Sequence, residues 1–210
     1  MTTLPTLLDL AAIATGGLFG AALAVQRKAP IVGVMLLAVL TALGGGMIRD
    51  TLLNVPIVAM TNDAYLPVAV AAALIGLPLA RRITEHPFVG LTLDALVLGL
   101  YVLVGTEKAS SLGYGAAACV FVGLITAIGG GTIADLMVGK TPVVLERGPW
   151  FASAAIAGAT VFVLLETYIA DTWLRLITVG VVAGLRFASE KLGWDAPSVE
   201  TLKNFKRSRD

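Results

Sequence analysis

The sequence contains few of the residues on which enzymes and metal-binding proteins depend. Among its 210 residues only 14% are charged, and it has one cysteine and one histidine. A single thiol, Cys119, allows no intrachain disulfide or redox pair, and we find no metal-ligand spacing. There is also no nucleophile beside a base and no phosphate loop, so we expect neither an enzyme nor a cofactor or metal. The net charge of +1 gives no sign of nucleic-acid binding.

Lysine and arginine are absent before residue 27, so the chain begins without the basic region of a signal peptide. We therefore expect its first apolar run to remain as a membrane helix. With 57% hydrophobic residues and a mean hydropathy of +0.89, the chain is too apolar for an ordinary soluble domain. Since roughly 20 helical residues cross a bilayer, the apolar runs predict an all-α membrane protein with seven transmembrane helices. Their approximate ranges are 6–25, 30–53, 63–80, 87–105, 112–138, 149–167 and 172–189.

The basic residues gather on one side of these predicted helices. When the helices alternate in direction, twelve of the fifteen lie on one side, and only Arg49, Lys108 and Arg175 lie on the other. The positive-inside rule then places the N-terminus outside and the C-terminus in the cytoplasm.

An internal repeat appears when the chain is aligned with itself at an offset of 85 residues. TALGGGMIRD at 41–50 then matches TAIGGGTIAD at 126–135 in seven of ten positions. Three predicted helices, an odd number, separate the copies, so the second half should cross the membrane in the opposite direction, as in many transport proteins. The predicted division is repeat one at about 7–82, repeat two at about 87–168, a seventh helix at about 172–189 and a cytoplasmic tail at 190–210.

Each repeat places three consecutive glycines inside a predicted membrane helix. Such a triplet costs roughly 2 to 3 kcal/mol of helix stability relative to alanine. We expect the glycines to let the helices bend or unwind and open a polar cavity. The alternative is that they allow tight packing between helices.

Acidic residues follow both triplets. Arg49 precedes Asp50 in the first motif, whereas Ala134 precedes Asp135 in the second. A single guanidinium between the two carboxylates could hold a closed conformation. The alternative is that Arg49 extends to the outer interface beside Asp50.

Three further charges lie at the ends of predicted helices. Asp9 and Asp94 align at the offset of 85, and each is either a helix cap or an acidic pore mouth. Lys108, after the fourth predicted helix, is either another mouth residue or an interfacial anchor.

The motifs GGGMIRD at 44–50 and GGGTIADLMVGKTP at 129–142 resemble the paired signatures of the prokaryotic trimeric intracellular cation (TRIC) channel family. The resemblance includes GTEKA at 105–109 and covers residues 7–190. It implies a seven-helix protomer with two inverted three-helix repeats, assembled as a homotrimer in a prokaryotic plasma membrane. It also implies conduction of monovalent cations, chiefly potassium, through a pore in each protomer gated at glycine-broken second and fifth helices.

The resemblance implies that nine residues form the ion pathway and gate. It also implies that the protein's partners are membrane lipids and potassium or sodium ions. The nine are Gly44, Gly45, Gly46, Arg49, Asp50, Gly129, Gly130, Gly131 and Asp135. Ala134 departs from the pattern, because many bacterial relatives have a second arginine there. Two other functions fit the sequence: a secondary transporter of a small zwitterion such as glycine, and a structural, lipid-organising protein.

Overall fold

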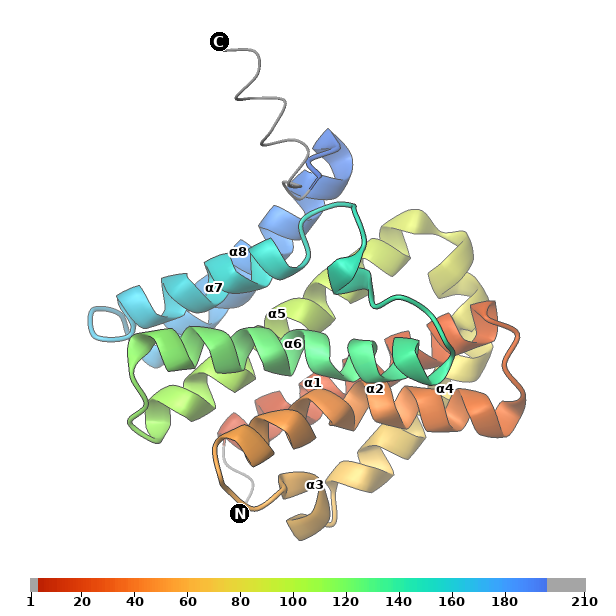
Figure 1. The fold of residues 1–210 in the computed structure, drawn as a ribbon, viewed down its shortest axis with the longest axis horizontal. Helices are drawn as coiled ribbons and strands as arrows, with labels where there is room; N and C mark the ends of the chain where they lie inside the picture. The colour runs from red at the N-terminus through yellow and green to blue at the C-terminus, as the bar shows by residue number, and fades with distance from the viewer. Residues whose placement is uncertain (1–3, 196–210) are drawn as a thin grey trace.

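The computed structural model of the protein describes residues 4–195 as a bundle of helices (Figure 1). The predicted basic tail beyond residue 195 lies outside the described residues. The elements are α1 Leu4–Gln26, α2 Ile31–Leu52, α3 Val58–Thr61, α4 Tyr65–Glu85, α5 Pro87–Ser111, α6 Ala116–Met137, η1 Val143–Leu145, α7 Ala152–Leu165 and α8 Asp171–Leu192.

Six of the helices described between residues 4 and 195 are long and apolar enough to cross a membrane: α1, α2, α4, α5, α6 and α8. The all-α membrane fold is therefore confirmed, but the count of seven spans is not. At 14 residues, α7 measures only about 21 Å. It begins later than the predicted span 149–167 because Pro149 forms an isolated bridge with Asp195, and the Trp150 indole donates to the carbonyl of Asp195. These contacts involve the two residues that would otherwise form the first turn of the predicted helix.

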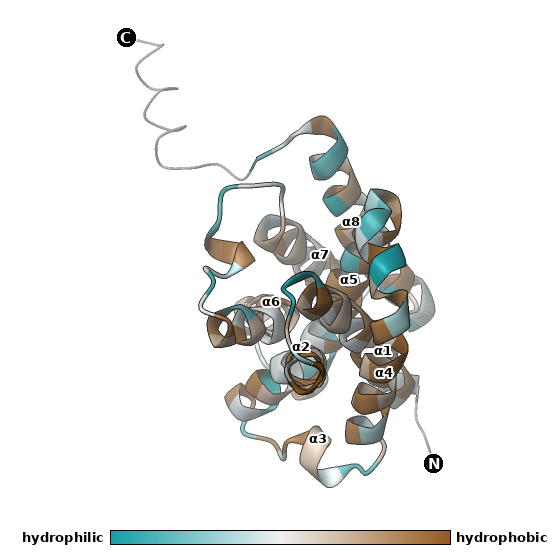
Figure 2. Ribbon diagram, turned by 90° about the vertical axis from the view of Figure 1, so that its right-hand side faces the viewer, coloured by the Kyte–Doolittle hydropathy of each residue, from teal (hydrophilic) through white to brown (hydrophobic). Residues whose placement is uncertain are grey.

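Apolar side chains face both outward and inward. Most of the helical ribbon is coloured as hydrophobic or neutral in Figure 2, and the hydrophilic colour lies mainly on loops and helix ends. Leu36, Leu74 and Phe121 are about half exposed, a cost in water that lipid tails remove. The core, in contrast, is rich in fully buried alanines such as Ala38 and Ala73, whose small side chains let helices approach closely.

The two glycine-rich helices lie side by side and antiparallel near the centre of the bundle, and both are continuous (Figure 1). The prediction that α2 and α6 unwind at their glycines is therefore wrong. A Cβ atom on Gly45 would lie 2.0 Å from the carbonyl oxygen of Thr126, and one on Gly130 would lie 2.2 Å from that of Thr41. These glycines are required because each helix presses its backbone against the other, as the packing alternative predicted.

The remaining glycines of the triplets have more varied surroundings. Gly44 faces Ile133 and Gly129 faces Ile48, again at an offset of 85 residues. A Cβ atom on Gly46 would lie 3.7 Å from the Arg49 guanidinium, an ordinary contact distance, and one on Gly131 would meet no atom within 4 Å. Close packing thus explains the first two glycines of each triplet but not the third.

Candidate functional site

A buried ion-pair cluster closes one end of the bundle, where α1 and α4 begin and α2 and α5 end. We call it the Arg49 cluster; it consists of Asp9, Arg49, Asp50, Tyr65 and Lys108. The side chain of Arg49 is only 1% exposed, and a void of about 10 Å³ remains beside it. This end of the helix bundle is therefore sealed.

The Arg49 guanidinium bridges two carboxylates. Its Nε lies 2.8 Å from Oδ1 of Asp50, and its two terminal nitrogens lie 3.2 and 3.4 Å from the oxygens of Asp9. The Tyr65 hydroxyl donates to Asp9 at 2.9 Å, and Nζ of Lys108 lies 2.7 Å from Asp50. Two positive and two negative groups give the cluster no net charge, which is how buried charges are tolerated.

These contacts correct two interpretations of Arg49. It does not extend to an interface, because it is buried, and its second partner is Asp9 rather than Asp135. The reason is position: Asp50 and Asp135 end antiparallel helices and so lie at opposite ends of the bundle. One side chain cannot reach both.

A cavity of about 440 Å³ occupies the opposite end of the same helices. Its wall is largely apolar and includes Phe19 of α1 and Gly131 of α6. It reaches the surface beside Val143 and Glu190, both of which are exposed. One end of the bundle is thus open to a cavity and the other end is closed.

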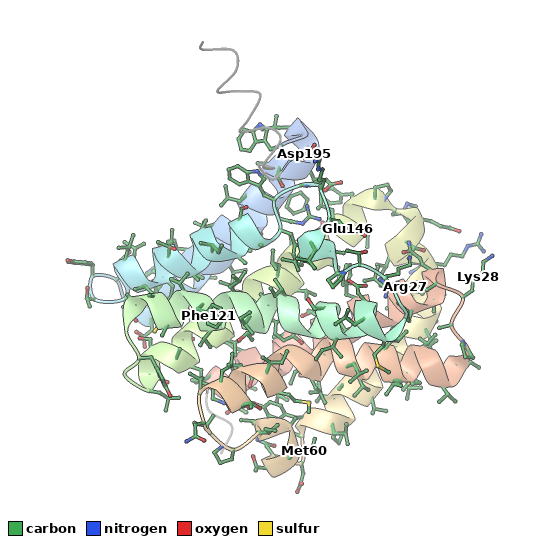
Figure 3. All side chains as sticks on the ribbon, in the orientation of Figure 1. Arg27, Lys28, Met60, Phe121, Glu146 and Asp195 are labelled. Atoms are coloured by element: carbon green, nitrogen blue, oxygen red, sulfur yellow. The ribbon has the colours of Figure 1, made fainter. Side chains whose placement is uncertain are left out.

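Charged side chains line this cavity in pairs. Arg27, at the end of α1, forms an ion pair with Asp135 of α6, whereas its neighbour Lys28 points away from the bundle (Figure 3). Nε of Arg186 on α8 lies 2.8 Å from Oδ2 of Asp94 on α5. These four charges are therefore paired at close range but remain next to open space.

Two carboxylates also fix the segment that follows each glycine-rich helix. The backbone N–H of Val58 donates to Asp50 at 2.9 Å, and that of Val143 donates to Asp135 at 3.3 Å. Both contacts span eight residues, and they recur at the offset of 85. Asp50 and Asp135 consequently each make two contacts, an ion pair and a hydrogen bond to the loop at their own end of the bundle.

Asp9, Asp94 and Lys108 have different roles from the alternatives considered. Neither aspartate caps a helix, because each lies beyond the first turn and points to an arginine. Lys108 is not an interfacial anchor, since its ammonium is bound to Asp50. The two aspartates lie at opposite ends of the bundle.

Tyr101 of α5 was not singled out from the sequence, yet it lies between the cavity and the Arg49 cluster and lines both. Its hydroxyl donates to the carbonyl of Ala42 in α2. Gly16 makes room for it, because a Cβ atom there would lie 2.6 Å from that hydroxyl. The available signal was a lone tyrosine in the middle of an apolar helix, opposite a glycine.

Comparison with known proteins agrees with this architecture. A family model described as "Glycine transporter" matches residues 6–81 and 91–167. The TRIC trimeric intracellular cation channel orthologue from Rhodobacter sphaeroides is 30% identical, with a TM-score of 0.82 over 91% of this chain and 99% of that chain. This chain belongs to the TRIC channel family. The family predicted from the glycine signatures is therefore confirmed.

Other relatives are similarly close. A solved TRIC cation channel is 28% identical, with a TM-score of 0.81 over 91% of this chain and 95% of that one. A UPF0126 membrane protein of Deinococcus radiodurans is 32% identical over 77% of this chain and 76% of its own length. The inner membrane protein YadS of Escherichia coli is 34% identical over 73% and 75%. The protein is thus a multi-pass membrane protein whose solved relatives are cation channels.

Proposed function

We propose that the protein is a potassium-permeable channel for monovalent cations, with a separate pathway in each protomer. The pathway runs from the cavity, past Tyr101, to the Arg49 cluster. The observation that carries this proposal is that one chain has a charged cavity at one end of its central helices and a sealed ion-pair cluster at the other. Opening the cluster would join the two ends. The solved TRIC relatives are cation channels, which supports the same function.

The charges favour cations over anions. Three carboxylates and two guanidiniums line the cavity, which leaves one net negative charge, and such a cavity concentrates cations. The three carboxylates are Asp94, Asp135 and Glu190, and the two guanidiniums are Arg27 and Arg186. Strong potassium selectivity requires rings of free backbone carbonyls, whereas α2 and α6 are continuous helices. Only modest discrimination between potassium and sodium is expected.

The proposed assembly is a homotrimer in the plasma membrane of a prokaryote, with the N-terminus outside. The Arg49 cluster then faces outward and the cavity faces the cytoplasm. Residues 7–82 and 87–168 form the two inverted halves, and 172–189 forms the final helix. In this arrangement α7 is the sixth span, and a locally thinner bilayer accommodates its short length. Lipid tails cover the exposed apolar side chains.

Potassium flux into proteoliposomes tests this function. The purified protein should admit potassium but not the bulky N-methyl-D-glucamine cation, and it should give unitary currents in a planar bilayer. Asp135→Asn should lower the flux by removing a cavity charge. An absence of potassium flux and of unitary currents would contradict the channel proposal.

Transport of a small zwitterion is the second candidate. Carboxylates and guanidiniums both line the cavity, so both ends of an amino acid have a partner, and a cavity closed at one end suits alternating access. The matching family model is described as a glycine transporter. Saturable glycine uptake without unitary currents would favour this function over a channel.

A further inference from the structure

Two arginines of α8 face two carboxylates of α5. Arg186 pairs with Asp94, and Arg175 pairs with Glu107. The arginine side chains are almost equally exposed, at 13% and 14%. The pairs lie at opposite ends of the α5–α8 contact, and of the two only the Arg186 pair lines the cavity. Of these two arginines, α8 therefore supplies one to the proposed pathway and uses the other for contact with its neighbour.

Arg186 provides Asp94 with the arginine partner that the second motif lacks, since that motif has Ala134 in place of an arginine. In the first half, Asp9 is paired with Arg49. The residues at an offset of 85 are Asp94 and Ala134, and both line the cavity. Asp94 nevertheless has an arginine partner, contributed by α8, which lies outside the two segments matched by the family model. An acid–arginine pair is thus present at both ends, although only one motif encodes the arginine.

Arg186 has two contacts besides its ion pair with Asp94. Its Nη1 lies 3.1 Å from Glu190, which is one turn further along α8 and has a side chain 45% exposed. The Phe151 ring lies 5.8 Å from the guanidinium carbon, within the range of a cation–π contact. Arg186 can therefore release Asp94 while keeping Glu190, and Asp94 would then be free to receive a permeating cation.

We propose that Arg186 is the second barrier residue of the pathway and limits cation passage at the cavity end. This inference rests on the proposed channel function. Its positive charge repels cations in the cavity, and its bond to Asp94 occupies the carboxylate that would otherwise bind them. Arg49 closes a sealed end, whereas Arg186 acts at an end that is already open.

The test compares Arg186→Gln with Arg175→Gln in planar bilayers and proteoliposomes. Each variant removes one arginine of α8 from one carboxylate of α5 and from one acid a turn away on α8, so the loss of pairing is matched. Arg186→Gln should raise potassium conductance about three- to tenfold and change its rectification. Arg175→Gln should keep the wild-type conductance. Equal effects of the two variants, or no effect of Arg186→Gln on a conducting protein, would overturn the inference.

Charge is tested separately from structure by chemical modification. Arg186→Cys, made together with Cys119→Ala to remove the native thiol, is treated with methanethiosulfonates of either sign. The positive reagent should return the flux to the wild-type level, and the negative reagent should raise it further. Arg186→Lys, which retains the charge and most of the packing, should conduct like the wild type. If both reagents change the flux in the same direction, Arg186 is structural. If the wild type itself conducts nothing, the channel proposal fails instead.

Discussion

The net charge of the Arg49 cluster should set the barrier at the closed end, and a double-variant cycle on Arg49 and Asp9 tests this. Arg49→Gln changes the net charge of the cluster from zero to −1, Asp9→Asn changes it to +1, and the double variant restores zero. At an effective dielectric constant of about 20, one unit charge about 10 Å from an ion is worth roughly 1.7 kcal/mol. Arg49→Gln should therefore raise potassium flux roughly 15- to 20-fold, and Asp9→Asn should lower it by a similar factor.

The assay is potassium flux into proteoliposomes, with thermal unfolding measured on the same preparations. Removing one partner of a buried ion pair costs about 3 to 5 kcal/mol of stability, because the other charge is left unpaired. Each single variant should therefore unfold at a lower temperature than the double variant. Arg81→Gln is the control, since this arginine is 83% exposed and pairs with Glu85 one turn away. The reasoning is refuted if both single variants shift flux in the same direction, or if the double variant keeps the change of either one.

Three further predictions concern packing, orientation and assembly. Gly45→Ala and Gly130→Ala should each destabilise the protein by at least about 1 to 3 kcal/mol through overpacking, whereas Gly131→Ala should be neutral or stabilising; equal unfolding temperatures would contradict this. In cells producing a cysteine-free background, Met60→Cys should react with an impermeant maleimide and Lys28→Cys should not, and the reverse pattern would invert the topology. Native mass spectrometry should give three times the chain mass of 21.7 kDa, and a monomer in mild detergent would contradict the trimer.

The sequence predicted the membrane fold and the charged ends better than it predicted the role of the glycines. Hydropathy and length determine where a helix can cross a bilayer, so the six long helices lie close to their predicted ranges. A glycine triplet, in contrast, is compatible with a broken helix and with a crowded one. Which of the two occurs depends on where the partner backbone lies, and at Gly45 that is the carbonyl of Thr126, 81 residues away in the chain.

The ion-pair partners were hard to predict for a similar reason. Aligning the halves identifies Arg49 and its neutral counterpart Ala134, but it contains no information about residues outside the repeat. Arg186 belongs to a helix that has no counterpart in the first half, so no internal comparison could assign it to Asp94. Tyr101 was missed because it aligns with Gly16 at the offset of 85, and a glycine there gives no sign that the position is important.

The two halves also neutralise each other. Asp50 of α2 is paired with Lys108 of α5, and Asp135 of α6 is paired with Arg27, which directly follows α1. At the offset of 85 residues Lys108 aligns with Leu23, so Arg27 follows the aligned position by four residues, about one helical turn. Each glycine-rich helix thus ends on a carboxylate held by the opposite half. Because the same carboxylates also hold the loops at Val58 and Val143, a shift at the end of α2 or α6 would disturb an ion pair between the halves together with a loop contact.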